Sequence, residues 1–260
     1  MYTLGIDIGS TTSKCVLLHN GQEVSGKSLV QAGTGTEGPA LAMARILEDS
    51  GIGRDEIGFV MATGYGRTSF KEADGELSEL SAHGKGVHFT CPWARTIIDI
   101  GGQDAKVIQL SEKGSIANFT MNDKCAAGTG RFLEVMAGIL HLDIRELEVY
   151  AGKAVSPVKI SSTCTVFAES EVISQLSRGV ALSDLIAGIC SSVASRVSAL
   201  AKRMQVKPEV VMSGGVAQNG GVRNALVKEL GMEIFVPEDA QYMGALGAAL
   251  AGYEKCRPKE

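Results

Sequence analysis

Residues 7–14 read Asp7-Ile8-Gly9-Ser10-Thr11-Thr12-Ser13-Lys14 and decide the fold. Apolar residues on both sides predict two short strands, over 4–8 and 14–18, joined by this polar turn. A carboxylate followed by glycine and hydroxyl groups suits a phosphate, because glycine lets the backbone come close and N–H groups then surround the oxygens. We expect Asp7 to hold a hydrated Mg²⁺ and Lys14 to neutralise charge on a transferred phosphoryl group. An ordinary β-turn with a solvated lysine is the alternative.

A second copy of this pattern follows later in the chain. It reads Asp99-Ile100-Gly101-Gly102-Gln103-Asp104, after a predicted strand over 96–100 and before another over 106–110. The two carboxylates and the amide in this stretch are suited to orienting an attacking water. The repetition of strand, Asp, glycine turn and strand indicates an internal duplication that relates Asp7 to Asp99. Two such hairpins facing each other could clamp the phosphates of a nucleotide.

A third glycine turn follows a predicted strand over 209–212. It reads Ser213-Gly214-Gly215-Val216-Ala217-Gln218-Asn219. We expect this turn to lie under an adenosine, with its amide side chains near the ribose or the base. Gly130 and Gln241 are further candidates for contact with the nucleotide. A lone Gly-Gly turn is a weak signal, but as the third member of this series it strengthens the prediction of a nucleotide site.

Strand and helix patterns alternate along the chain, which predicts an α/β protein. Among them are a helix expected over 38–50 and a strand expected over 57–63, whereas no helix is expected between the third glycine turn and the terminal helix.

We place a domain boundary near Pro92, at the end of a predicted helix. The first lobe is expected to cover 1–93 and the second 94–242, with Cys125, Cys164 and the adenosine turn in the second. A terminal helix over 243–258, rich in alanine and leucine, is expected to pack back on the first lobe.

The composition argues against several classes of partner. The 260 residues carry a net charge of −4, which implies no basic face, so we expect no nucleic acid. The apolar windows are short and interrupted by glycine, serine or charge, so we expect no membrane span. A strand that begins at Tyr2 leaves no room for a signal peptide. We therefore expect a cytoplasmic protein whose six cysteines stay reduced.

Two cysteines differ from the others because each precedes a predicted helix within a stretch of small residues. These stretches are Asn122-Asp123-Lys124-Cys125-Ala126-Ala127-Gly128-Thr129-Gly130 and Ser161-Ser162-Thr163-Cys164-Thr165. The partial positive charge of a helix N-terminus favours a thiolate, so Cys125 and Cys164 are candidate metal ligands. The alternative is that both are small first-turn residues near the nucleotide. Two cysteines cannot complete a four-thiolate site, whereas a symmetric dimer supplies four around its two-fold axis.

The three glycine turns resemble the phosphate-1, phosphate-2 and adenosine motifs of the acetate kinase, sugar kinase, heat-shock chaperone and actin superfamily. This resemblance implies an α/β fold of two duplicated ribonuclease-H-like lobes. It also implies that ATP binds in the cleft between the lobes and that the lobes close during turnover.

Together with residues 122–134 and 160–175, the same turns resemble the ATPase activators of 2-hydroxyacyl-CoA dehydratases, over essentially the whole chain. The 2-hydroxyglutaryl-CoA dehydratase activator is the best-known type. The resemblance implies a homodimer in which Cys125 and Cys164 of both subunits bind one 4Fe–4S cluster, alongside ATP or ADP and Mg²⁺. It also implies that one electron passes from ferredoxin or flavodoxin through this cluster to the dehydratase, at the cost of ATP hydrolysis.

Three other functions stay open on the sequence. The chain could be the ATPase subunit of a benzoyl-CoA-reductase-type enzyme, which resembles the activators. It could be a small-molecule kinase of the same fold, with Asp99 or Asp104 as the base that deprotonates an acceptor hydroxyl. It could also be a non-redox ATPase switch, in which the cysteines have no metal to bind.

Overall fold

The computed structural model describes residues 1–161 and 164–257 and divides the chain into two compact units. Unit 1 comprises Met1–Ala94, Leu110–Ala117 and Pro237–Glu260, and unit 2 comprises Arg95–Gln109 and Asn118–Val236. Segments 110–117 and 237–242, which we had expected in the second lobe, belong to unit 1 in this division. Residue 258, the last of the predicted terminal helix, lies outside the described residues. That the two lobes move as separate bodies stays a prediction.

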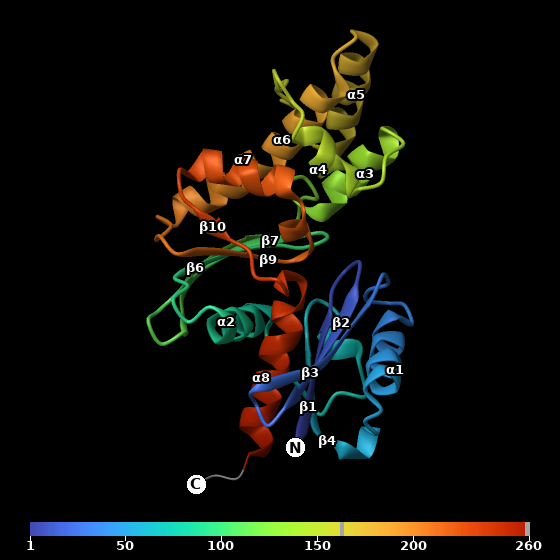
Figure 1. Ribbon diagram of the computed structural model, residues 1–260, viewed down its shortest axis with the longest axis vertical. Coiled ribbons are helices and arrows are strands. Elements are labelled where there is room, and N and C mark those ends of the chain that lie inside the picture. Colours follow the sequence, from blue (N-terminus) through green and yellow to red (C-terminus); the bar gives the residue numbers. More distant parts are fainter. Residues whose placement is uncertain (162–163, 258–260) are drawn as a thin grey trace. The chain divides into compact units, whose positions relative to one another are not determined.

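Unit 1 is built on a five-stranded sheet in the order β3-β2-β1-β4-β5 (Figure 1). Its strands are β1 (Tyr2–Ile8), β2 (Ser13–His19), β3 (Glu23–Val30), β4 (Ile57–Thr63) and β5 (Gly75–Glu76). β1 pairs antiparallel with β2 and parallel with β4, so it lies at the centre of the sheet. Asn20 and Gly21 have φ angles of 50° and 70°, as an Asn-Gly turn between two antiparallel strands requires.

The helices of unit 1 are α1 (Gly38–Ser50), α2 (Glu79–Thr90) and α8 (Met243–Cys256). Of these, α1 and α8 pack on the sheet and α2 packs on α8. Pro39 in the first turn of α1 and Gly51 at its end, with φ of 67°, explain where that helix begins and stops. Its residues Ala42, Met43 and Ile46 are buried, because α1 packs on β2 and β3 (Figure 1).

The terminal helix α8 packs against β1, β4 and α2 at short range. Small residues make this possible. A Cβ atom on Gly5 of β1 would overlap the carbonyl of Ala245, and one on Gly247 would overlap the carbonyl of Ala82 in α2. Thr3 of β1 also donates its hydroxyl to the Ala249 carbonyl at 3.0 Å. The alanine-rich sequence of α8 is therefore that of a buried helix.

Unit 2 contains a second five-stranded sheet, in the order β10-β9-β6-β7-β8. Its strands are β6 (Thr96–Ile100), β7 (Ala105–Leu110), β8 (Ile116–Asn122), β9 (Val210–Ser213) and β10 (Ile234–Phe235). β6 pairs antiparallel with β7 and parallel with β9. Counted along the chain, both sheets have the order third, second, first, fourth, fifth, which confirms an α/β architecture built by duplication.

The remaining helices belong to unit 2. They are α3 (Gly130–Ile139), α4 (Glu146–Ala151), α5 (Thr165–Ser177), α6 (Leu182–Arg203) and α7 (Gly220–Leu230). Contrary to our expectation from the sequence, α6 is long and apolar enough to cross a membrane by length and composition alone. However, 61% of its most apolar 18-residue stretch is buried, and the helix packs against α4 and α7. This is the environment of a core helix.

Candidate functional site

The first predicted phosphate turn connects β1 to β2 in unit 1. Asp7 and Lys14 stand opposite each other in the β1–β2 register, and Lys14 Nζ lies 3.5 Å from Asp7 Oδ2. The Gly9 N–H donates to the Thr12 carbonyl at 3.0 Å, which closes the turn. The hydroxyl of Ser13 is already used, because it donates to a backbone carbonyl at 2.8 Å. The structure therefore brings together the predicted carboxylate, ammonium and glycine turn.

Two loops that the sequence analysis did not select support this turn. The Thr34 N–H donates to the Gly9 carbonyl at 2.9 Å, and the Gly66 N–H donates to the Ile8 carbonyl at 2.9 Å. A Cβ atom on Gly33 would overlap the backbone of the turn. In both loops the available signal is a pair of glycines two residues apart.

Two stretches match motifs of other nucleotide-binding folds by their letters alone. Residues 21–28 match Gly-x-x-x-x-Gly-Lys-Ser, and residues 33–38 match Gly-x-Gly-x-x-Gly. The first occupies a turn and the edge strand β3, not a loop that opens a helix. The second precedes α1 but follows β3, which pairs antiparallel with β2. Neither has the parallel strand-helix-strand context that gives these motifs their function, so the β1–β2 turn remains the phosphate candidate of unit 1.

The second predicted turn connects β6 to β7 in unit 2 and contains a buried lysine that the sequence analysis missed. Lys106 stands opposite Asp99 in the register, with its Nζ 3.1 Å from Asp99 Oδ2. The same ammonium pairs with Asp104. Ser213, at the end of β9, donates its hydroxyl to Asp99 Oδ1 at 2.8 Å. The predicted Asp99 and Asp104 are therefore brought together by a shared cation.

The duplication provides the signal by which Lys106 could have been found. Lys106 follows Asp99 by the same seven residues that separate Lys14 from Asp7, since 106 − 99 = 14 − 7. The two lysines differ in their environment. The side chain of Lys106 is 1% exposed and that of Lys14 is 13% exposed. The lysine of the second hairpin is therefore more deeply buried than the lysine of the first.

The glycines of the second turn are joined to α3 through the backbone. The Gly130 N–H donates to the Gly101 carbonyl at 2.9 Å, and the Arg131 N–H donates to the Gly102 carbonyl at 2.7 Å. These are two of the N–H groups that a helix N-terminus leaves without an intrahelical partner. Gln103 is exposed in the same turn. The predicted residue Gly130 thus lies directly beside the predicted turn.

The predicted adenosine turn leads from β9 into α7. Gly214 has a φ angle of 86°, and a Cβ there would overlap the carbonyl at the end of β6, so glycine is required. A short helical turn, η3 (Gly215–Gln218), follows, in which Gln218 is exposed. The side chain of Asn219 accepts the N–H of Val222 at 3.0 Å and caps α7. Its oxygen is thus already bonded within the protein.

Gln241, the remaining predicted nucleotide contact, lies in unit 1. It belongs to the short turn η4 (Ala240–Tyr242) ahead of α8 and is half-buried. Lys27 of β3 holds this turn, because its Nζ lies 2.6 Å from Asp239 Oδ1 and 5.7 Å from the ring centroid of Tyr242. Burial raises the pKa of Tyr242. The turn that presents Gln241 is therefore fixed to the sheet.

The carboxylate of Asp7 fits a hydrated Mg²⁺. Oδ2 faces Lys14, whereas Oδ1 is buried and has no hydrogen-bond partner within the described part of the chain. A buried carboxylate oxygen needs a donor. Mg²⁺ retains several waters in nucleotide sites, and these waters are strong donors.

The cysteines separate clearly by exposure. Cys125 and Cys164 are exposed, whereas Cys15, Cys91 and Cys190 are buried. Burial raises the pKa of Cys15 and of Cys190 to about 12, as expected of inert structural thiols. Cys256 is partly exposed, so the two fully exposed thiols are those that the sequence analysis selected.

The two exposed cysteines differ in their relation to the following helix. Cys164 is the N-cap residue of α5, and its carbonyl accepts the N–H of Ala168 at 2.9 Å. Cys125 lies in the loop between β8 and α3, where its carbonyl accepts from the Asn122 side chain at 3.0 Å. Residues 162 and 163 of the predicted stretch lie outside the described residues. One thiol is therefore at a helix N-terminus and the other is in the loop before a helix.

Exposed apolar side chains accompany the exposed cysteines in the sequence. Val166 and Phe167, in the first turn of α5, are 67% and 69% exposed. Phe119 and Met121 of β8, ahead of Cys125, are also exposed.

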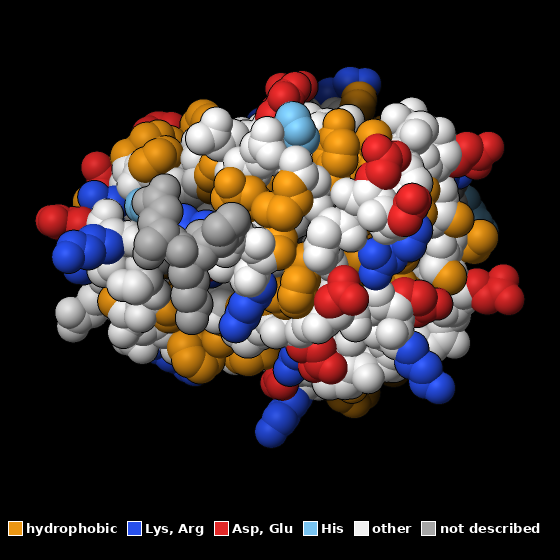
Figure 2. Space-filling view, turned by 90° about the horizontal axis from the view of Figure 1, so that it is seen from below, with side chains coloured by type: hydrophobic (Ala, Val, Ile, Leu, Met, Phe, Trp, Pro, Cys, Tyr) orange, Lys and Arg blue, Asp and Glu red, His pale blue; other side chains and the backbone are white. Residues whose placement is uncertain are grey.

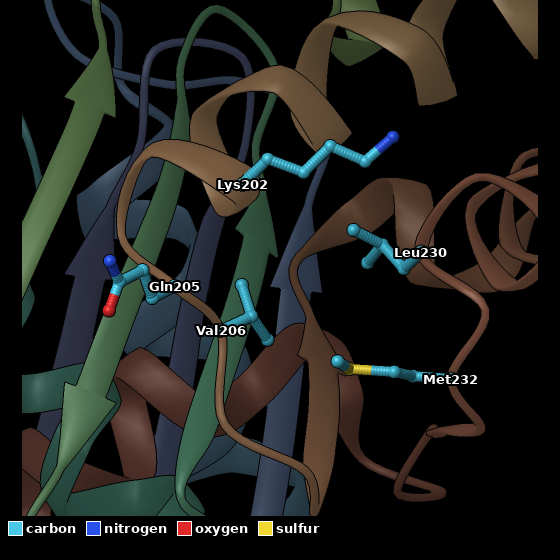
Figure 3. A pocket seen from close by; sticks show the side chains of 5 residues that line it. All are labelled: Lys202, Gln205, Val206, Leu230 and Met232. Carbon is cyan, nitrogen blue, oxygen red and sulfur yellow. The ribbon is translucent and has the colours of Figure 1, made fainter.

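A hollow of about 260 Å³ lies elsewhere in unit 2, at the ends of α6 and α7. Figure 3 shows the five side chains that line it, which are Lys202, Gln205, Val206, Leu230 and Met232. No predicted site residue is among them, so this hollow is separate from the candidate site.

Charged side chains of both signs are interspersed on the face shown in Figure 2, with apolar side chains in small groups between them. A surface of this kind has no extended field of one sign.

Comparison with known proteins places this site in a family. Residues 4–252 match the BadF/BadG/BcrA/BcrD ATPase family. The chain is 57% identical, over 98% of both chains, to the (R)-2-hydroxyglutaryl-CoA dehydratase activating ATPase of Acidaminococcus fermentans. It is 51% identical to the 2-hydroxyisocaproyl-CoA dehydratase activator of Clostridioides difficile, over all of this chain and 98% of that protein.

Solved structures agree with the sequence relatives. The activator of the 2-hydroxyisocaproyl-CoA dehydratase from Clostridium difficile, solved with bound ADPNP, superposes with a TM-score of 0.96 at 52% identity, over 98% of this chain and 95% of that one. A ROK family glucokinase from Streptomyces griseus has a TM-score of 0.59 at 13% identity, with 98% of this chain and all of that one covered, and shows the fold alone. The predicted actin-like ATPase fold is confirmed. The chain belongs to the BadF/BadG/BcrA/BcrD ATPase family, among the activating ATPases of 2-hydroxyacyl-CoA dehydratases.

Proposed function

We propose that this activating ATPase donates one electron to its dehydratase at the cost of ATP hydrolysis, and that two copies share one 4Fe–4S cluster held by Cys125 and Cys164. The observation that carries the proposal is that these two thiols are exposed in unit 2, whereas Cys15, Cys91 and Cys190 are buried. Thiolates have no one-electron chemistry of this kind by themselves, and a bound 4Fe–4S cluster would supply it.

A homodimer follows from the number of ligands. The cluster takes four thiolates and each chain offers two, so a two-fold axis through the site would complete the set. Val166 and Phe167 support this arrangement, because they follow Cys164 directly and expose apolar surface that a second copy would cover.

ATP or ADP is proposed to bind at the three glycine turns. In the first turn, backbone N–H groups and hydroxyls would bind phosphate oxygens, Lys14 would neutralise their charge, and Asp7 would hold the waters of Mg²⁺. In the second turn, Gln103 and Asp104 would orient the attacking water. The proposed contacts are Gly9, Ser10, Thr11, Thr12, Ser13, Lys14, Gly101, Gly102, Gly130, Gly214, Gly215, Gln218, Asn219 and Gln241, with Asp7, Asp99, Gln103 and Asp104 in the chemistry.

A physical link between nucleotide and cysteines supports the coupling of the two activities. The first turn of α3 is bonded to the carbonyls of Gly101 and Gly102, and the loop that holds Cys125 leads into this helix. A change in the second phosphate turn on hydrolysis would therefore be transmitted to the loop of Cys125. Such a shift alters hydrogen bonding and solvent exposure at the cysteine, which are the quantities that set the potential of a bound cluster.

The proposed partners are the dehydratase and a reduced ferredoxin or flavodoxin as electron donor. The 2-hydroxyacyl-CoA chemistry would take place in the dehydratase, since the three turns and two cysteines described here serve a nucleotide and a metal centre. We place the protein in the cytoplasm, where thiols stay reduced and available as ligands.

Iron and acid-labile sulfide per chain, measured on protein purified without oxygen, test the proposal. Four-thiolate ligation of one four-iron cluster per dimer predicts about two irons per chain. Cys125→Ser and Cys164→Ser should each lose the iron and the electron transfer while still binding ATP. Cys256→Ser is the matched control, because Cys256 is partly exposed at the end of α8, and it should keep both.

Two results would contradict the proposal. The first is wild-type protein that binds ATP but contains no iron, which would favour a non-redox switch. The second is electron transfer at the wild-type rate in a pure Cys125→Ser sample, which would remove this residue from the metal site.

A further inference from the structure

Two buried oxygen atoms lie at the carboxyl ends of β1 and β4 with no protein group to bond them. They are Asp7 Oδ1 and Thr63 Oγ1, and neither has a hydrogen-bond partner among residues 1–161 and 164–257. Asp7 is 4% exposed and Thr63 is 0% exposed. Most buried polar side-chain atoms are paired, so two such atoms together need an explanation.

The two residues are neighbours in the sheet. Asp7 is the register partner of Thr63 in the parallel pair β1–β4. Register partners in neighbouring strands project to the same face of the sheet, about 5 Å apart. The two oxygens therefore belong to one small polar site.

Two glycines border this site closely. A Cβ atom on Gly64, which has a φ angle of 87°, would contact Asp7 Oδ1, and one on Gly244 would contact Asp7 Oδ2. The other carboxylate oxygen, Oδ2, faces Lys14 at 3.5 Å. Oδ1 is thus the oxygen left without a partner among the described residues, and a side chain at position 64 would reach it.

We propose that Thr63 is a positioning residue for the hydrated Mg²⁺ that accompanies the nucleotide, because its hydroxyl and Asp7 Oδ1 together bind waters of that cation. This inference rests on the proposed binding of the phosphates at the β1–β2 turn. Mg²⁺ loses its waters reluctantly, so a protein binds it largely through groups that accept hydrogen bonds from those waters. A carboxylate oxygen accepts, and a threonine hydroxyl both accepts and donates, so the pair can hold two waters or a bridging one.

Thr63→Val is the informative change, because it keeps the shape and removes only the hydroxyl. The nucleotide-free protein should melt at or above the wild-type temperature, since no hydrogen bond is lost and an unpaired buried hydroxyl is removed. The Mg²⁺ concentration that gives half-maximal enhancement of ATP binding should rise about threefold to tenfold, the effect of one hydrogen bond. ATP affinity in excess EDTA should stay unchanged. Isothermal calorimetry with MgCl2 and ATP measures the two binding quantities, and thermal unfolding followed by circular dichroism measures the melting temperature.

Two variants test for a merely structural role. Thr63→Ser keeps the hydroxyl and should restore the wild-type Mg²⁺ dependence. Thr3→Val removes a buried hydroxyl on the same sheet that does have a partner, the Ala249 carbonyl at 3.0 Å. It should lower the melting temperature and leave the Mg²⁺ dependence unchanged, the opposite pattern to Thr63→Val.

Asp7→Asn separates this inference from the proposed function. If Asp7→Asn weakens the Mg²⁺ dependence and Thr63→Val leaves it at the wild-type value, the role of Thr63 is overturned while the nucleotide site stands. If instead Asp7→Asn binds Mg²⁺ and ATP as the wild type does, the proposed metal position is wrong, and so is the proposed role of Thr63.

Discussion

Removing the ammonium of Lys106 should strongly destabilise unit 2. The Nζ of this lysine lies 3.1 Å from Asp99 Oδ2 and also pairs with Asp104. The side chains of Lys106 and Asp99 are 1% and 2% exposed. Lys106→Met keeps the length and the apolar stem but leaves two carboxylates without the cation they share.

The size of the effect follows from the cost of a buried charge. Breaking a buried pair by removing one partner costs about 3 to 5 kcal/mol, because the remaining charge cannot return to water. For a unit of this size a loss of 1 kcal/mol lowers the melting temperature by roughly 3 °C, so Lys106→Met should melt about 9 to 15 °C lower. The matched change in the first hairpin, Lys14→Met, should cost less, since Lys14 is 13% exposed and its single pair is 3.5 Å long.

Thermal unfolding followed by circular dichroism measures the loss, and hydrogen exchange of a peptide spanning 96–110 locates it in β6 and β7. Asp99→Leu combined with Lys106→Met should regain most of the lost stability, because it removes the buried carboxylate as well. A Lys106→Met variant that melts with the wild type would refute the reasoning. So would a double variant that is less stable than the single one.

Two further predictions concern unfolding. Asn219→Ala should lower the free energy of unfolding by about 1 kcal/mol in urea titrations, because α7 loses the cap at the Val222 N–H; Asn219→Asp, which keeps the acceptor, should not, and equal losses would contradict the capping role. Burial raises the pKa of Cys15 and Cys190 from 9.0 to about 12, so the unfolded chain releases these protons first. The free energy of unfolding should therefore be insensitive to these thiols below pH 9 and fall as the pH rises from about 9 towards 12. The Cys15→Ala/Cys190→Ala double variant should show a smaller fall over this pH range, and a fall equal to that of the wild type would contradict the prediction.

The elements with strong local signals could be predicted from the sequence to the residue. The helix expected over 38–50 and the strands expected over 57–63 and 96–100 are α1, β4 and β6 with those bounds. In α1 a proline and a glycine mark the ends, and in the strands most residues are β-branched or apolar.

The helix α7 was missed because its first residues have the composition of a loop. Asn219, Gly220 and Gly221 favour turns when they are considered locally. In the structure Asn219 caps the helix, and a Cβ on Gly221 would overlap the Cβ of Ala151 at the end of α4. The glycine is thus explained by a contact with a helix seventy residues earlier in the chain, which local sequence patterns do not contain.

The candidate site shows the same division. Asp7, Lys14 and Asp99 could be selected because a charged residue within a few positions of a glycine turn can be recognised directly in the sequence. Lys106 and Thr63 were not selected that way, because Lys106 lies inside β7 between Ala105 and Val107, and a lone threonine at the end of β4 carries no signal of its own. Only the pairing of β6 with β7 and of β1 with β4 brings them beside the aspartates.

The link between the second phosphate turn and the Cys125 loop belongs to a class that no side-chain motif can reveal. It consists of two backbone hydrogen bonds, from the N–H groups of Gly130 and Arg131 to the carbonyls of Gly101 and Gly102. Because these carbonyls belong to the turn itself, they must move whenever its backbone changes conformation. Breaking both bonds would leave the first turn of α3 with unsatisfied N–H groups, so the helix start is constrained to follow. The proposed coupling therefore depends on the two backbone hydrogen bonds to the carbonyls of Gly101 and Gly102, and not on the identity of a charged residue.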